Sequence, residues 1–215
     1  MIAIPKIVSL GFLFMGVFIL IQVMMPVVSF QIWQLSQRFD VDTALISPQK
    51  NGGQSVLGVS IENKDNFPIF VSTNIREIAP LYTQFRISVP KLKLFDAAVY
   101  VETNDLTKGL VHLPGSALPG ERGNIFISGH SALSPLFLLK TALFAKLQDL
   151  KKGDQIIVEA EGTKFVYEVE ALKVVDPKDL SVINPPDKMG RYISLMTCVP
   201  PGLNFKRLVV LGKIL

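Results

Sequence analysis

The sequence predicts an all-β-dominated domain that follows an N-terminal membrane helix. Three observations lead to this prediction. An uncharged apolar run opens the chain, short β-like runs separated by turns follow from about Leu81, and a helix-like spacing of apolar residues occurs between Pro135 and Leu147. Many short strands with few helices are typical of a closed barrel or a sandwich. Of the two, we favour the barrel.

The apolar run extends from Ile7 to Trp33, about 27 residues without a charge. Roughly 20 residues are enough to cross a bilayer, and Pro26 is compatible with a span because membrane helices tolerate proline. A cleaved signal peptide is the alternative, but its apolar core would be shorter and a small-residue cleavage site would follow. We therefore expect residues 1–33 to form an uncleaved anchor. The flanking charges give only a weak indication of its orientation.

Residues 34–80 have the composition of a linker. They include NGGQS at Asn51–Ser55, NKDN at Asn63–Asn66, and a few short apolar clusters such as Phe67–Val71. Such a segment suits a spacer that holds a domain away from the membrane. The folded domain is then expected over residues 81–215.

The expected strands are apolar or alternating runs that end at glycine, proline or polar residues. Glu161, Gly162 and Thr163 suit a hairpin turn between two of them, and a short helical turn is expected from Pro177. In chain order these runs are Phe85–Val89, Ala97–Val101, Asn124–Ser128, Asp154–Ala160, Lys164–Val175, Arg191–Thr197 and Phe205–Ile214.

Charge and cysteine content exclude some classes of protein. The 22 basic residues barely exceed the 18 acidic ones, and no basic run stands out, so binding to nucleic acid is not expected. One cysteine cannot form an internal disulfide, so the domain must be stable through its core alone. That cysteine is reactive, pairs with another molecule, or is a small buried apolar residue.

The cysteine, Cys198, lies in the stretch SLMTCVPPG, at the end of an apolar strand and nine positions before Arg207. A cysteine nucleophile acts as the thiolate and needs a cation or a base nearby. If the two flanking strands pair antiparallel, the thiol and the guanidinium face the same end of the sheet. The arginine could then hold a carbonyl and stabilise an oxyanion; the alternative is a solvated strand arginine.

Two histidines, His112 and His130, could serve as the base. His130 follows an apolar strand and a glycine, and His112 also precedes a turn. Loops on a rigid scaffold often carry functional groups. Their local sequences alone do not choose between these two histidines.

Three segments resemble the sortases, which are cysteine transpeptidases of bacterial surfaces. SLMTC is similar to the family's T-L-x-T-C, with Ser194 for the first Thr, and VPPGLNFKRLVV resembles its proline-glycine loop and arginine strand. HLPGSALPGERGNIFISGHSA, His112 to Ala132, resembles H-x-P-G-T-A-L-P-G-E-x-G-N-x-x-I-x-G-H. The three segments occur in the expected order within residues 85–213.

This resemblance implies an eight-stranded sortase-type barrel, with one or two short helices, and a catalytic role for three residues. Cys198 would be the nucleophile, His130 the general acid and then the base, and Arg207 the group that binds substrate and stabilises the oxyanion. His112 would be structural. Thr197, beside the nucleophile, would line the oxyanion or substrate site.

The resemblance also implies partners and location. The substrates would be surface proteins with LPxTG-like sorting signals, and the acceptor an amine of a peptidoglycan precursor or a pilin. The chain would be a single-pass protein of the cell membrane with its catalytic domain outside. The sequence looks more like the single-domain D and E classes than the pilus-building class, although Ser131 stands where many relatives have Arg.

Two other readings stay open. A wall-directed cysteine peptidase or an L,D-transpeptidase would share the nucleophile, although the latter carries Ser-x-Gly-Cys where this chain has Met196 and Thr197 before the cysteine. A non-catalytic membrane-tethered β module with a buried cysteine is the third. No cofactor or metal is expected, since Glu121, Asp154 and Glu168 do not form a recognisable calcium loop.

Overall fold

A computed structural model describes residues 4–39, 59–64, 67–72, 80–131, 142–187, 189–201 and 205–215. The chain divides into two compact units, Met1–Thr43 and Ala44–Leu215. Each unit is described by itself below.

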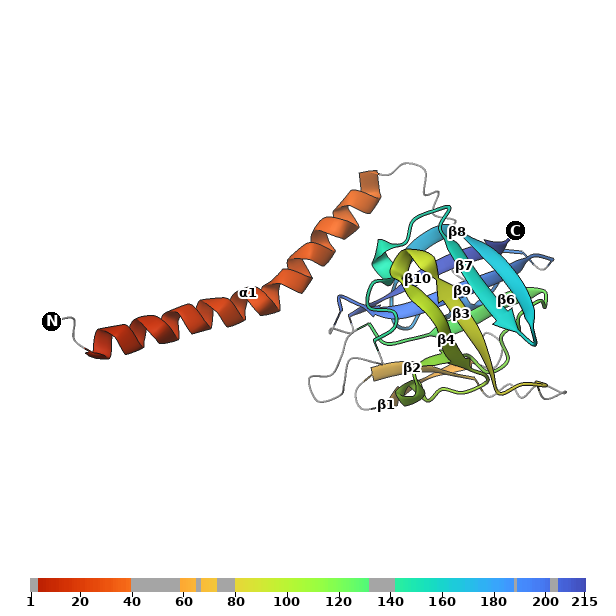
Figure 1. Ribbon diagram of the computed structural model, residues 1–215, viewed down its shortest axis with the longest axis horizontal. Coiled ribbons are helices and arrows are strands. Elements are labelled where there is room, and N and C mark those ends of the chain that lie inside the picture. Colours follow the sequence, from red (N-terminus) through yellow and green to blue (C-terminus); the bar gives the residue numbers. More distant parts are fainter. Residues whose placement is uncertain are drawn as a thin grey trace. The chain divides into compact units, whose positions relative to one another are not determined.

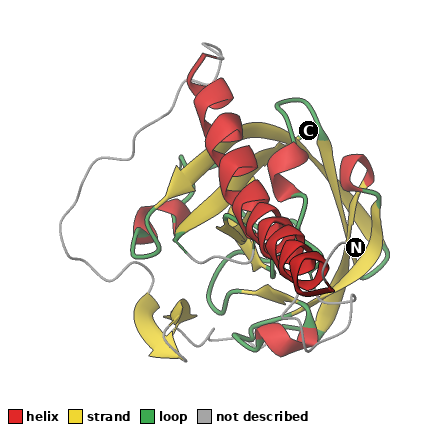
Figure 2. Cartoon of the chain, turned by 90° about the vertical axis from the view of Figure 1, so that its left-hand side faces the viewer, coloured by secondary structure: helices red, strands yellow, loops and turns green. Residues whose placement is uncertain are grey.

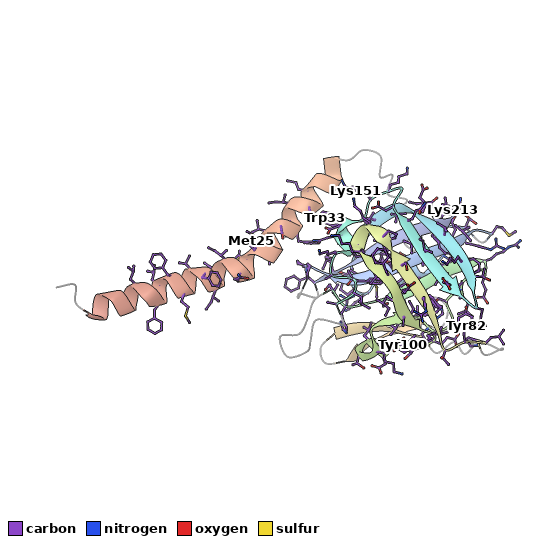
Figure 3. All side chains as sticks on the ribbon, viewed as in Figure 1. Met25, Trp33, Tyr82, Tyr100, Lys151 and Lys213 are labelled. Carbon is purple, nitrogen blue, oxygen red and sulfur yellow. The ribbon has the colours of Figure 1, made fainter. Side chains whose placement is uncertain are left out.

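The first unit contains one long helix, α1 (Ile4–Phe39), which continues through Pro26 (Figure 1). Its segment Ser9–Trp33 has a mean hydropathy of 2.3 and is long and apolar enough to cross a bilayer. Large apolar side chains project from it, such as Met25, which is 64% exposed (Figure 3). Phe30 and Trp33 stack near its end, with ring centroids 5.7 Å apart, and aromatic residues are common at membrane interfaces.

The second unit contains the predicted barrel. Eight strands close in the order β10-β8-β7-β3-β4-β5-β6-β9, and Figure 2 shows them curving around one another. The strands are β3 (Gln84–Val89), β4 (Leu94–Tyr100), β5 (Leu110–His112), β6 (Gly123–Ser128), β7 (Gln155–Ala160), β8 (Thr163–Val175), β9 (Arg191–Val199) and β10 (Lys206–Ile214). Two neighbouring pairs, β4–β5 and β6–β9, are parallel, and the other pairs are antiparallel.

Side-chain burial follows the two-residue period of a strand on β3. Phe85, Ile87 and Val89 are buried and the residues between them face outward. In contrast, β6 and β9 are buried on both faces along most of their length. The reason is the β8–β9 connection, which covers their outer face.

That connection contains the 3-10 helix η4 (Leu180–Ile183), close to the turn expected from Pro177. Asp179 caps it, because the Ser181 amide donates to Asp179 Oδ1 at 3.0 Å. Ile183 packs with Leu113 and Phe126, and this apolar cluster is completed by the partly buried residues Leu180, Val182 and Met196.

The predicted hairpin turn is also present. Ala160 pairs with Thr163, and Glu161 and Gly162 between them have φ values of 48° and 73°. Two consecutive positive φ angles suit the right-handed twist of the flanking strands.

The structure differs from the sequence-based prediction in the expected helix and in the expected linker. Of the helix expected between Pro135 and Leu147, residues 135–141 lie outside the described part, and residues 143–146 form turns before the 3-10 helix η3 (Leu147–Asp149). The segment expected to be a linker contains an antiparallel pair, β1 (Val59–Lys64) and β2 (Phe67–Ser72). Two further 3-10 helices are η1 (Pro90–Leu92) and η2 (Leu106–Lys108).

Candidate active site

Cys198 and Arg207 are direct partners in the antiparallel ladder between β9 and β10. Side chains directly opposite each other in such a ladder emerge on the same face, about 5 Å apart at Cβ. Arg207 is only 4% exposed, whereas Cys198 is partly buried and is a free thiol. The guanidinium donates from Nη1 to the Lys206 carbonyl at 3.3 Å. The ladder therefore fixes a buried cation beside the thiol.

The thiol lies on the face of β9 that packs against η4, not on the face that lines the barrel interior. Phe126 pairs with Ser194, and Phe126 belongs to the apolar cluster under η4. Alternation along the strand places Met196 and Cys198 on this same face. Cys198 is therefore on the side of the sheet that carries η4 and not in the barrel interior.

His130 reaches the same level from the other side of β9. The last pair of the parallel β6–β9 ladder is Ser128 with Met196. Two residues further along each of these strands, His130 is level with Cys198. The ladder is extended by Gly129, whose amide donates to the Met196 carbonyl at 3.0 Å. The β9–β10 ladder thus pairs Cys198 with Arg207, and the β6–β9 ladder brings His130 to the same level.

Gly129 is required at its position by close packing. A Cβ atom there would lie 2.5 Å from Leu110 Cδ2 and 2.8 Å from Phe144 Cδ2. The Phe144 amide also donates to the His130 carbonyl at 3.2 Å. The turn that carries His130 is therefore packed closely between β5 and the segment before η3.

Thr197 lies beside Cys198 on β9 and binds the turn that carries His130. It is 3% exposed, and its hydroxyl donates to the Gly129 carbonyl at 2.8 Å. Because neighbouring strand residues alternate, its side chain emerges opposite to that of Cys198. Its hydroxyl therefore holds the turn before His130. That Thr197 also lines the oxyanion or substrate site stays a prediction.

His112 is fully buried and belongs to another hydrogen-bond network. Its Nε2 lies 2.9 Å from the Ala117 carbonyl and 2.9 Å from Ser116 Oγ. The Glu102 amide donates to its Nδ1 at 3.4 Å. Nε2 thus contacts the loop that follows β5 and Nδ1 the turn that follows β4, which is a structural arrangement. Of the two histidines, only His130 follows β6 to the level of Cys198.

Burial governs the protonation of the thiol and of His130. It raises the pKa of the Cys198 thiol, and the positive charge of Arg207 opposes this increase. Burial also lowers the pKa of His130. Both shifts favour the uncharged forms, so a neutral thiol and a neutral imidazole predominate at neutral pH.

Two pairs of residues near the site were not predicted from the sequence. Lys206 forms an ion pair of 3.3 Å with Asp176, which connects the start of β10 to the end of β8. Asn124 Nδ2 donates to the Ile183 carbonyl of η4 at 3.0 Å. Both contacts join residues far apart in the chain, so no local pattern indicates them.

No metal site is seen in the described part of the chain, where no three His, Cys, Asp or Glu residues group together. Two of the acidic residues considered above bind backbone amides instead: Glu121 accepts from Leu118 at 2.7 Å and Asp154 from Lys151 at 2.8 Å. That the protein needs no cofactor stays a prediction.

Comparison with known proteins places this geometry in a family. Residues 87–215 match the family model of the Sortase domain. Sortase D of Bacillus subtilis (strain 168) is 33% identical over 115 residues, which cover 52% of this chain and 53% of that protein. Sortase SrtE1 of Streptomyces coelicolor (strain ATCC BAA-471 / A3(2) / M145) is 38% identical over 77 residues, 33% of this chain and 22% of that protein. The chain thus spans about half or less of these two relatives.

Solved structures agree with the fold. Sortase C-1 from Actinomyces oris (formerly Actinomyces naeslundii) superimposes with a TM-score of 0.55 at 30% identity, over 63% of this chain and 76% of that one. A lid mutant of sortase A from Corynebacterium diphtheriae gives 0.53 at 36% identity, over 64% and 72%. The expected eight-stranded sortase-type barrel is confirmed.

Proposed function

The chain belongs to the sortase family, and on this premise we propose that it is a membrane-anchored cysteine transpeptidase that cleaves an LPxTG-like sorting motif and transfers the acyl group to an amine. The observation that carries the proposal is the pairing of Cys198 with the buried Arg207, with His130 level with them across β9. A nucleophile, an acid–base group and a fixed cation thus share one end of the strand β9.

In the first step the Cys198 thiolate attacks the threonine carbonyl carbon of the sorting motif. The carbonyl oxygen becomes an oxyanion, and Arg207 stabilises it from its fixed position. The His130 imidazolium donates its proton to the glycine nitrogen, the C–N bond breaks, and a thioester remains on Cys198.

In the second step an amine attacks the thioester carbonyl. His130, now neutral, accepts a proton from the attacking nitrogen, and the C–S bond breaks to restore the thiolate. The new amide joins the surface protein to the acceptor. Buried surroundings favour this route because they limit competition from water.

The apolar cluster beside η4 supports a peptide substrate with apolar side chains. Leu180, Val182 and Met196 are only partly buried, and Met196 lies two residues before Cys198 on the same face of β9. These three side chains would contact the Leu-Pro end of a sorting motif, while Cys198 meets its threonine carbonyl.

The helix α1 supports a position at the membrane. Its segment Ser9–Trp33 would anchor the chain, with the catalytic domain on the outer side of the membrane. The substrates would be surface proteins that carry the sorting signal, and the acceptor an amine of a peptidoglycan precursor or a pilin. Similarity to Sortase D and to Sortase SrtE1 supports the D- and E-like classes.

The test uses the full chain in detergent micelles with a quenched LPxTG peptide and an amine acceptor. The wild type should form both the cleaved peptide and its amine conjugate, identified by mass spectrometry. Cys198→Ala should abolish both products, and Arg207→Ala should lower both by about 10²-fold or more. Arg86→Ala is a matched control, because Arg86 is an exposed arginine on β3, three strands away from β10 in the barrel order.

Two outcomes would overturn the proposal. Normal cleavage by Cys198→Ala would exclude the nucleophile. Cleavage by the wild type without any amine conjugate, at saturating amine, would instead identify a wall-directed cysteine peptidase.

A further inference from the structure

Asn124 has no role in the chemistry above, yet its side chain makes a specific contact with η4. It lies near the start of β6 and is 4% exposed. Its Nδ2 donates to the Ile183 carbonyl at 3.0 Å and lies 3.4 Å from the Val182 carbonyl. One buried amide thus reaches the last two residues of η4, which follow it by almost sixty positions in the chain.

These two carbonyls need a donor from outside the helix. The carbonyl groups at a helix end have no partner within the helix, and a 3-10 helix of four residues has few internal bonds of its own. The Asn184 amide closes the helix with a bond of 3.3 Å to the Ser181 carbonyl. Asn124 supplies donors for the carbonyls that remain.

The position of η4 decides where its apolar side chains lie. Ile183 is 1% exposed and packs against Phe126. Leu180 and Val182 flank it and stay partly exposed next to Met196. A rotation or a shift of η4 would therefore move the apolar side chains that pack beside Met196, on the face of β9 that carries Cys198.

Among the described residues, the Asn124 side chain forms hydrogen bonds only through its amide nitrogen Nδ2. In the described part of the chain, Asn124 Oδ1 is buried without a hydrogen-bond partner. The bond to η4 is thus the polar contact through which this side chain acts, and an aspartate would place a carboxylate against the two carbonyl oxygens.

We propose that Asn124 is a positioning residue that fixes η4 through the Val182 and Ile183 carbonyls and so sets the apolar peptide-binding surface beside Cys198. This inference rests on the proposed function for the nature of the substrate. It assigns to Asn124 an effect on peptide binding and not on the acyl-transfer steps.

The test measures steady-state kinetics and hydrogen exchange on the full chain in micelles. Asn124→Leu, which has a similar shape without donors, and Asn124→Asp should raise KM for the LPxTG peptide about tenfold, as expected for one buried hydrogen bond. The kcat should stay within about twofold of the wild type. Asn104→Leu is the matched control, because Asn104 lies between β4 and β5 and makes no side-chain bond to η4; its KM should not change.

Hydrogen exchange gives a readout that needs no activity. The amides of Ser181 and Asn184 should exchange faster in the Asn124 variants, whereas the amides shared by β9 and β10 should keep their wild-type rates. If Asn124→Leu and Asn124→Asp do not fold, Asn124→Ala removes the amide without adding charge or bulk and carries the same expectations.

Unchanged KM with unchanged exchange at η4 would overturn the inference. A loss of protection throughout β9 and β10 would overturn it as well, because Asn124 would then act on the core as a whole. A wild-type chain that does not cleave the peptide would refute the proposed function, while faster exchange at η4 in the variants would still establish the contact of Asn124 with η4.

Discussion

Arg207 lies directly across the β9–β10 ladder from Cys198, and its charge opposes the effect of burial on the thiol. Replacing Arg207 with Met keeps much of the buried volume but removes the charge. We expect the pKa of Cys198 to rise further, because burial would then act without opposition. The measurement is the rate of alkylation by iodoacetamide as a function of pH. A midpoint equal to or below that of the wild type would contradict this role of Arg207, and Arg86→Met should leave the midpoint unchanged.

The pH dependence of activity follows from two opposite shifts. The pKa of His130 is lowered from 6.5 and that of Cys198 is raised from 9.0. The reactive pair of thiolate and imidazolium is then a minor species whose fraction stays constant between the two values. The kcat/KM should therefore show a plateau, with an acid limb below pH 6.5 and an alkaline limb above pH 9. Stopped assays across pH 5–11 check this, and an alkaline limb near neutral pH would show that the thiol is not shielded by burial.

Thr197→Val tests whether the Thr197 hydroxyl holds the turn that carries His130. Valine has nearly the same shape but cannot donate to the Gly129 carbonyl. Leaving a buried acceptor without its partner costs about 1–3 kcal/mol, and the turn before His130 loses its fixed position. We expect lower kcat and lower stability, measured by peptide cleavage and by urea unfolding in micelles.

Thr197→Ser is the matched control, since it keeps the hydroxyl. Near-wild-type activity of Thr197→Ser with a defect in Thr197→Val is the expected result. Equal defects in both variants would indicate that the methyl group, and not the hydroxyl, is what matters.

Replacing His112 should lower the stability of the domain, whereas replacing His130 should abolish its activity. His112→Ala removes a fully buried ring and leaves the Ala117 carbonyl and the Glu102 amide without it. We expect a loss of more than about 2 kcal/mol in the free energy of unfolding, with little change in kcat for the folded fraction. His130→Ala should do the reverse: no detectable transfer and a small change in stability.

Urea titration gives the free energy of unfolding. Titration of Cys198 with a thiol reagent gives the number of active sites and so the kcat of the folded fraction. If His112→Ala loses as much kcat per active site as His130→Ala does, the assignment of the general acid to His130 is wrong.

Much of the barrel could be predicted from local pattern. The alternation in β3, the hairpin turn at Glu161 and Gly162, and the apolar runs of β9 and β10 all depend on residues close together in the chain. The pairing of Cys198 with Arg207 belongs to this group, because a short connection joins the two strands. By contrast, β5 has three residues, too few to show a period, and was not predicted.

The sequence by itself determined which residue types are available: one thiol, two imidazoles, an arginine beyond the double proline, and an apolar N-terminal run. The tertiary structure decided that His130, and not His112, follows β6 to the level of Cys198, where the Thr197 hydroxyl points, and that Asn124 binds η4. These contacts form across the parallel β6–β9 pair and the β8–β9 connection. Their partners are far apart in the chain, so they depend on how the closed barrel packs and not on any local period.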